Sequence, residues 1–266
     1  MIVSLKKNFR LFILYSKRSL QTILQGRVGI ILFTLGKVLR VLSFLLIIFL
    51  IFSKTRLVKG YSFNQMIIFY LTFNVIDTLT QLLFRAVYRF RQLVVSGDLD
   101  LVLLKPHHPF IRILIGEVDF LDFFLLIPFI GLLIYFIFFG QHNSVSPASI
   151  TVYFLLVINS LLIATAFHIA VLALAILTTE VDHTILIYRD MTQLGRFPID
   201  IYKEPIRGIF TFIVPVGIMM SFPPKALFQL LSLNIIIIAF LVSSLVLIGS
   251  LKLWDIALKK YQSWGG

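Results

Sequence analysis

The long apolar segments of this chain limit its possible folds more than any other feature. A helix crosses the hydrocarbon core of a bilayer with about 20 consecutive apolar residues. Six segments approach or exceed that length: residues 28–52, 63–84, 111–139, 150–178, 206–220 and 230–251. In lipid a helix satisfies its own backbone hydrogen bonds. The sequence therefore predicts an all-α membrane protein with six transmembrane helices.

The fifth apolar segment is short, and prolines interrupt it. Pro215 lies within it, and Pro223 and Pro224 follow directly. Proline lacks a backbone donor and breaks helices, and irregular backbone at membrane depth is tolerated only where protein or water covers it. We therefore expect a broken or re-entrant element over residues 215–229, before the last span, with all three prolines interrupting helical structure on the far side of the membrane.

Composition agrees with a membrane location. Of the 266 residues, 59% are hydrophobic and 14% are charged, whereas soluble domains carry about 25% charged residues. The chain has no cysteine, which excludes disulfides and thiolate metal sites. Because no loop is long enough for a catalytic domain, residues 1–266 are expected to form a single transmembrane domain.

The first 27 residues are expected to form an amphipathic helix in the membrane interface. At 100° per residue, five basic side chains fall within one third of the helix circumference, and most apolar residues gather opposite them. The basic residues are Lys6, Lys7, Arg10, Lys17 and Arg18. A basic amphipathic helix beside a span usually lies on the cytoplasmic surface. We expect no cleaved signal peptide, because no small-residue cleavage site follows the first apolar segment.

The net charge of +12 is explained by topology. With six spans and both termini in the cytoplasm, 20 of the 24 Lys and Arg residues lie on the cytoplasmic side: eight in residues 1–40, five in 85–112, four in 180–207 and three in 252–266. This bias accounts for the basicity without a nucleic-acid partner. It predicts cytoplasmic loops over residues 85–110 and 179–205 and a cytoplasmic tail over 252–266. The basic tract around Lys54 is the exception to the bias.

A polar stripe runs along the second span. Its members recur at helical spacing: Asn74, Asp77, Thr78, Gln81 and Arg85. A carboxylate at membrane depth is costly unless it is paired or hydrated. The stripe, and Asn74, Asp77 and Gln81 in particular, could line a pathway, or Asp77 could make a structural bond to a neighbouring helix.

Two further polar features lie in or near spans. Glu117, Asp119 and Asp122 cluster at the start of the third span, where we expect interfacial ion pairs with Arg112 and other basic groups. His168 stands among apolar residues of the fourth span and is expected to form an interhelical hydrogen bond. No metal-spaced cluster or nucleophile–base set is found in the sequence, so neither a metal site nor a catalytic residue is predicted.

A short apolar helix is expected between the second and third spans. Gly97 permits a tight bend, Asp98 is placed to act as its N-cap, and Pro106 ends it. Its residues Leu99, Leu101 and Leu104 have no core of their own to enter. Such a helix must lie on the bilayer surface or dock into another protein.

Three ordered motifs give the chain a family resemblance. They are Gly97-Asp98-Leu99-Asp100-Leu101-Val102-Leu103-Leu104-Lys105-Pro106, then Arg196-Phe197-Pro198-Ile199-Asp200-Ile201-Tyr202, and the ending Lys260-Tyr261-Gln262-Ser263-Trp264-Gly265. Together they resemble ABC exporter permeases of the second type (ABC-2), in the compact six-span bacterial subfamily. The resemblance covers essentially the whole chain.

The resemblance implies an ATP-driven exporter. Two permeases, identical or paralogous, would pair in the inner (cytoplasmic) membrane of a bacterium. Separate ATPase subunits would bind ATP and Mg and receive the helix within residues 94–105. The chain has no phosphate-binding G-x-x-x-x-G-K-[ST] motif and is not expected to be an enzyme or to hold a cofactor itself. The alternatives are an ion channel or secondary transporter not driven by ATP, a membrane-embedded enzyme and a non-transporting scaffold.

Overall fold

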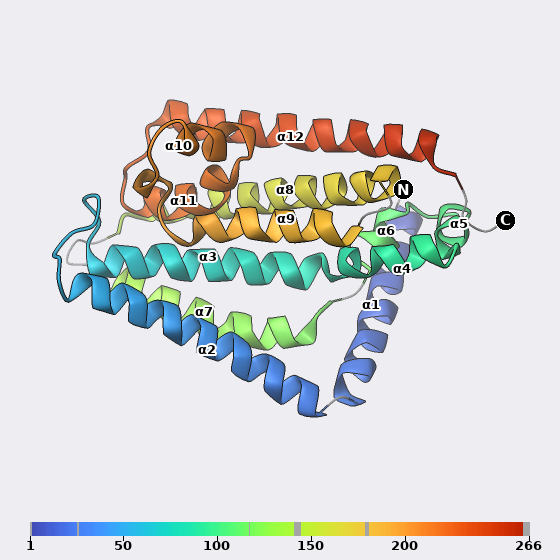
Figure 1. Cartoon of the computed structure of the whole chain (residues 1–266), viewed down its shortest axis with the longest axis horizontal. Helices are drawn as coiled ribbons and strands as arrows, with labels where there is room; N and C mark the ends of the chain where they lie inside the picture. The colour runs from blue at the N-terminus through green and yellow to red at the C-terminus, as the bar shows by residue number, and fades with distance from the viewer. Residues whose placement is uncertain (1, 26, 117, 141–144, 179–180, 263–266) are drawn as a thin grey trace.

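The structure is a computed structural model that describes residues 2–25, 27–116, 118–140, 145–178 and 181–262. Within these ranges the regular structure is helical, apart from one isolated β-bridge between Val58 and Tyr61. Most of the long helices run roughly along one direction of an elongated bundle, and the N-terminal helix crosses that direction (Figure 1). The prediction of an all-α membrane protein is confirmed.

Among the described residues, six helices are longer than 18 residues: α1 (Ile2–Gln25), α2 (Arg27–Phe52), α3 (Phe63–Leu83), α7 (Phe120–Phe138), α8 (Pro147–Thr178) and α12 (Leu233–Lys260). Of these, the last five are long and apolar enough to cross a membrane, the first of them over Val28–Phe52. The described residues add one bent pair, Ile206–Ile213 with Val216–Leu227, whose two helices meet at 91°. The expected broken element before the last span is therefore present.

Shorter elements lie at the two ends of the bundle. The α5 end holds η1 (Arg85–Arg89), α4 (Phe90–Val95), α5 (Asp98–Leu103) and α6 (Phe110–Ile113), and both chain termini lie near it (Figure 1). The α11 end holds the α2–α3 loop, η3 (Ile199–Ile201), α10 (Ile206–Gly208), the π-helical turn η4 (Ile209–Ile213) and α11 (Val216–Leu227). Between the ends run α9 (Val181–Gln193) and η2 (Leu194–Arg196).

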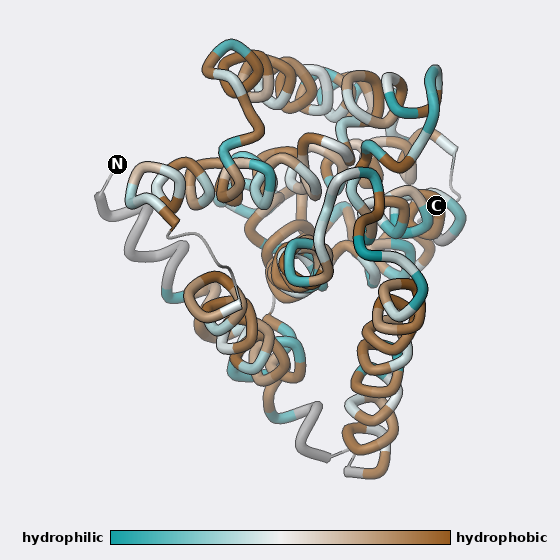
Figure 2. Tube along the Cα trace, turned by 90° about the vertical axis from the view of Figure 1, so that its left-hand side faces the viewer, coloured by the Kyte–Doolittle hydropathy of each residue, from teal (hydrophilic) through white to brown (hydrophobic). Residues whose placement is uncertain are grey.

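Helix α3 is the central helix of the core. Ser62 caps its start in a capping box with Gln65, which satisfies the first backbone donors. Most of its apolar window, 72%, is buried, against 11% for α2 and 17% for α12. The outer faces of α2 and α12 are apolar and exposed; α2 stands away from the bundle as a mostly brown limb in Figure 2. Such faces suit lipid or a second membrane protein.

The third span begins later than the sequence predicted. Residues 111–139 were expected to form one helix, but α6 ends at Ile113 and α7 begins at Phe120. The Asp119 carboxylate accepts a hydrogen bond from the Leu121 amide at 3.0 Å and caps α7. A side-chain cap of this kind fixes where a helix starts, independently of the apolar run around it.

The fifth passage through the bundle differs from the expected one. From the end of α8 the chain returns along α8 through α9, where the Tyr188 ring lies 4.7 Å from the His168 ring. It reaches the α11 end at Asp200, which bonds to Tyr61 and Lys225. Residues 180–207 were predicted to lie on one side of the membrane with the 85–112 loop, and Tyr61 and Lys225 on the other. That prediction was wrong, because Asp200 contacts both of the latter residues.

The expected helix over residues 206–220 is bent at Pro215, as its sequence suggested. Pro223 and Pro224, however, lie inside α11 and do not interrupt it. A proline at position 223 leaves the Met219 carbonyl without its usual helical donor. The Ser160 hydroxyl lies 2.6 Å from that carbonyl oxygen and donates to it instead. This bond from α8 satisfies the carbonyl that Pro223 leaves without a donor.

The predicted amphipathic segment forms α1. Its side chains are described over residues 10–21, where Arg10, Lys17 and Arg18 are exposed as expected. Tyr15 packs under the Arg112 guanidinium, 4.7 Å from ring centre to Cζ. Ile13 remains 48% exposed, so this helix keeps an apolar surface that the bundle does not cover.

Candidate functional site

The helix α5 projects at one end of the bundle because of a glycine. Gly97 has φ of +74° and occupies the N-cap position, a conformation that costs other residues free energy. Asp98 was expected to be the cap but is the first helical residue. Its carboxylate accepts a 2.7 Å hydrogen bond from the Ser96 hydroxyl. A carboxylate in the first turn still interacts favourably with the helix dipole.

The leucines of this segment divide into two groups. Leu99 is fully buried, so the expectation that it lacks a core was wrong; with Val102 it fixes α5 to the bundle. Leu101 is 59% exposed and Leu104 is 81% exposed. The helix is therefore held by one face and presents apolar side chains on the other.

A hollow lies beside α5. Its volume is about 290 Å³, and it is lined by Ala86, Arg89, Gln92, Leu93, Ser96, Asp98 and Arg112.

 The volume of this hollow is at the lower limit for ligand pockets, so the hollow is better suited to a protruding side chain than to a whole small molecule. Lys105 and Pro106 beyond it are exposed. The α5 end thus offers exposed leucines, a small hollow and charges of both signs on one surface.

The stripe on α3 is part of a polar network. The Asp77 carboxylate accepts a 2.8 Å hydrogen bond from the Gln81 amide and lies 3.9 Å from the Arg40 guanidinium on α2. Asn74 is 2% exposed and donates to the Tyr70 carbonyl of its own helix at 2.7 Å. Asp77 therefore has the structural partner on a neighbouring helix that one interpretation of the sequence required.

The acidic cluster near α7 is neutralised, though not by Arg112. Asp119 lies 3.3 Å from Arg85, and the fully buried Asp122 forms an ion pair with Lys37. Lys37 also donates to Gln81 at 3.3 Å, which joins this pair to the α3 stripe. Glu117 lies outside the described residues. The network therefore links α2, α3 and α7.

His168 does not form the expected interhelical hydrogen bond. Its ring is fully buried, and Nδ1 bonds to the Ala164 carbonyl of its own helix at 2.8 Å. Its contacts with other elements are ring contacts, at 4.7 Å from both Phe84 and Tyr188. The residue is thus a packing element between α8, α9 and the end of α3.

The second sequence motif connects the core with the α11 end. The Arg196 guanidinium lies over the rings of Phe44 and Phe73, at 5.6 and 5.9 Å. Pro198 is buried and Phe197 packs against Phe44, with 5.0 Å between ring centres. The motif therefore fastens η2 and η3 to α2 and α3, instead of forming a loop beside α5.

Asp200 is the centre of a polar cluster at the α11 end. We call this cluster of Asp200, Tyr61 and Lys225 the polar lock. Tyr61 donates to Asp200 at 2.7 Å, and Lys225 Nζ lies 2.6 Å from Oδ2 of Asp200. Burial alone would raise the pKa of Asp200, but the bonds from Lys225 and Tyr61 outweigh it and hold the pKa below its ordinary value. Burial and the Asp200 acceptor raise the pKa of Tyr61. The lock joins three segments of the chain.

A family model described as an ABC-2 family transporter protein matches residues 38–265. The chain belongs to the ABC-2 transporter family. No match was found among curated proteins or among solved structures. The resemblance inferred from the three motifs is thereby confirmed, and the chain is a multi-pass membrane permease component.

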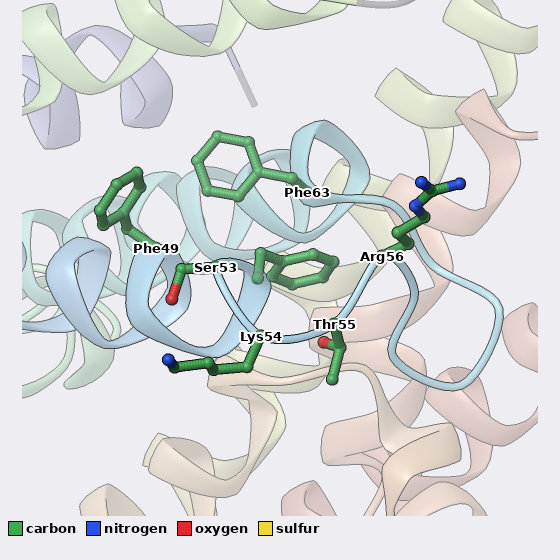
Figure 3. A pocket seen from close by; sticks show the side chains of 7 residues that line it. Phe49, Ser53, Lys54, Thr55, Arg56 and Phe63 are labelled. Carbon is green, nitrogen blue, oxygen red and sulfur yellow. The ribbon is translucent and has the colours of Figure 1, made fainter.

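This ABC-2 permease has a second surface feature that the sequence did not single out. A pocket of about 520 Å³ lies where α2 turns into α3 (Figure 3). Its lining combines aromatic rings with basic and hydroxyl side chains: Phe49, Phe52, Ser53, Lys54, Thr55, Arg56 and Phe63. The basic tract around Lys54, an exception to the charge bias, was the one signal that could have pointed to it.

Metal chemistry has no site in the part of the ABC-2 permease that the structure describes. No group of three or more His, Asp or Glu side chains there could hold a metal ion. The polar residues instead form ion pairs that connect helices.

Proposed function

We propose that this ABC-2 permease is the membrane subunit of an ATP-driven exporter and that α5 docks on a separate ATPase subunit. The observation that carries the proposal is the exposure of Leu101 and Leu104 on a helix anchored by buried Leu99. An apolar face that is rigidly held and left uncovered is typical of an interaction surface.

Such a contact can transmit force. Buried apolar anchors usually dominate an interface, and truncation of one can cost about 2 kcal/mol, which corresponds to roughly a thirtyfold loss of affinity. Because Leu99 and Val102 tie α5 to the core, movement of an ATPase bound to Leu101 and Leu104 would move the helices of the bundle. In this arrangement ATP and Mg belong to the ATPase, and the permease itself is not an enzyme.

The charge distribution supports a cytoplasmic position for the α5 end. Residues 1–40, 85–112 and 252–266 carry 16 of the 24 Lys and Arg residues, and cytoplasmic segments are enriched in these residues. We therefore place both termini in the cytoplasm and the permease in the bacterial inner membrane. A second permease copy or a paralogue would cover part of the exposed apolar surface, and lipid the rest.

An ion channel or secondary transporter not driven by ATP is the second candidate. The buried ion pair of Lys37 with Asp122 and the partly exposed pair of Arg40 with Asp77 favour it, because ionisable residues inside a membrane bundle often mark pathways. Such a protein would bind no ATPase. Co-purification therefore separates the two functions.

The test is a pull-down of the cognate ATPase with Leu101→Glu or Leu104→Glu at equal membrane yield. Leu57→Glu is the matched control, because Leu57 at the α11 end is as exposed as Leu101, at 59%. We expect the α5 variants to lose ATPase binding and transport while Leu57→Glu keeps both. Undiminished binding by the α5 variants would mean that these leucines only touch lipid.

A further inference from the structure

An exposed arginine lies on α9. Arg189 follows Tyr188, whose ring contacts the fully buried His168 of α8. An arginine that faced lipid inside the hydrocarbon core would cost a few kcal/mol. We therefore expect the Arg189 side chain to face water or another protein.

Arg189 is one of four cations gathered there. Lys37, Arg40, Arg189 and Arg196, which we call the cationic cluster, come from α2, α9 and η2. Arg40 lies 3.9 Å from the Asp77 carboxylate, Lys37 donates to Gln81, which itself bonds to Asp77, and all four cations act electrostatically on that carboxylate. The bundle thus concentrates positive charge around a single carboxylate of α3.

Ion pairs within the chain do not neutralise the cationic cluster. Lys37 is held by Asp122, and Asp77 lies 3.9 Å from Arg40. In the part of the chain that the structure describes, no ion pair is found for Arg189 or Arg196. Asp190 is also exposed on α9, but successive residues of an α-helix point about 100° apart. The cluster therefore keeps an excess of positive charge.

Two of the cations, Arg40 and Arg189, are more exposed to solvent than the Asp77 carboxylate. The Asp77 side chain is 13% exposed and that of Arg40 is 36% exposed, and Arg189 is exposed as well. A molecule that approaches α9 meets the cations before it meets the carboxylate. Aromatic rings adjoin them, because Phe44 stacks on Tyr70 at 4.4 Å and also carries the Arg196 guanidinium.

We infer that the cationic cluster binds the acidic group of the transported molecule, so that the cargo is an organic anion with an apolar part. Guanidinium groups recognise carboxylates and phosphates through paired, charge-assisted hydrogen bonds. Phe44, which is partly exposed and stacked on the buried Tyr70, supplies apolar surface for the remainder of the molecule. The pocket near Lys54 and Arg56 at the α11 end (Figure 3) has the same combination of rings and cations and would receive the anion on its way out. The inference rests on the proposed transport function.

The test measures equilibrium binding to the purified full-length permease in nanodiscs, with empty nanodiscs subtracted. The probes are pyrenebutyrate, its neutral amide and pyrenebutylamine, which share one apolar body and differ in charge. We expect the anion to bind about tenfold more tightly than the amide, the effect of one charge-assisted hydrogen bond, and the amine to bind most weakly. Equal binding of anion and amide would overturn the inference.

Variants then assign the preference to the cluster. Arg189→Gln should lose most of the preference for the anion and Arg189→Lys should keep part of it, whereas Lys252→Gln, at an exposed position of α12, should behave like wild type. Arg189 has no ion pair to lose, so the variant should fold; Arg196→Gln provides a second test. Full preference in both glutamine variants would refute the assignment.

The outcome is independent of the ATPase. The binding assay uses the permease alone, while pull-down of the ATPase by the same Arg189→Gln preparation reports on the α5 contact. Loss of anion preference with intact ATPase binding supports both proposals. An intact preference in a wild-type permease that binds no ATPase would reject the ATP-driven function and leave the anion site standing.

Discussion

Tyr61 donates a 2.7 Å hydrogen bond to Asp200, 139 residues later in the chain. The bond places η3 beside the α2–α3 loop, although the charge bias had assigned the two segments to opposite sides of the membrane. Lys225 completes the lock from α11. This one contact determines where the chain lies after α9.

The first prediction concerns topology. Single cysteines at Ser53 and Lys203, both exposed, should react with a membrane-impermeant maleimide from the same side, and a cysteine at Ser96 from the opposite side. The chain has no cysteine of its own, so the unmodified permease is the blank. Labelling of positions 203 and 96 from one side would restore the arrangement expected from charge alone.

The second prediction concerns the stability of the lock. Asp200→Ala leaves Lys225, whose side chain is 12% exposed, without a partner and should cost about 3 kcal/mol; Tyr61→Phe should cost about 1 kcal/mol. The control is Glu204→Ala, which breaks a pair with Arg207 whose side chains are 57% and 46% exposed and should cost less than about 1 kcal/mol. Thermal unfolding in nanodiscs measures the stability loss of each of the three variants and so gives their order. Equal losses in all three variants would contradict it.

The pH dependence of the lock follows from the lowered pKa of Asp200. A carboxyl whose pKa is depressed on folding contributes stability above its unfolded value, ordinarily 3.8, and loses it as the pH falls through the folded value. The difference in Tm between wild type and Asp200→Asn should stay constant from about pH 8 to pH 5. It should shrink below about pH 4, and a difference that disappears near pH 6 would show that another group controls the lock.

The third prediction separates two carboxylates of the α2–α3–α7 network. Asp122 is fully buried and paired with Lys37, so Asp122→Asn should cost about 3–5 kcal/mol and lower the folded yield. Asp77→Asn should cost less than about 1 kcal/mol, because Arg40 is partly exposed and can turn to water. Asp77→Asn should instead reduce transport. A loss of yield in Asp77→Asn without a specific transport defect would make that residue structural.

The fourth prediction tests the packing of η2 against α11. A Cβ atom on Gly195 would lie 2.6 Å from the Cβ of Met220, a separation that forces the backbones apart. Gly195→Ala should therefore destabilise the permease by about 1–3 kcal/mol. Gly249→Ala is the matched control: nothing lies within 4 Å of its new atom, and alanine in a helix should add about 0.5–1 kcal/mol. A neutral Gly195→Ala would mean that η2 does not pack closely against α11.

Local hydrophobicity and local chemistry were readable from the sequence. Residues 28–52 and 63–84 anticipate α2 and α3 to within a residue, because a run of apolar side chains needs lipid or a core whatever surrounds it. The bend at Pro215 follows from a missing donor in one residue. The family motifs, too, are contiguous strings of residues.

Contacts between distant segments had to come from the tertiary structure. Helix α9 carries charges, so hydropathy could not reveal that it runs back along α8; a polar helix enters the bundle only where other elements cover it. Leu99 and Leu104 are the same residue type five positions apart, yet one is buried and the other is 81% exposed. Which leucine is free to bind a partner depends on what lies beside it. That neighbour comes from the folding of the whole chain, as does the position of Asp200 next to Tyr61.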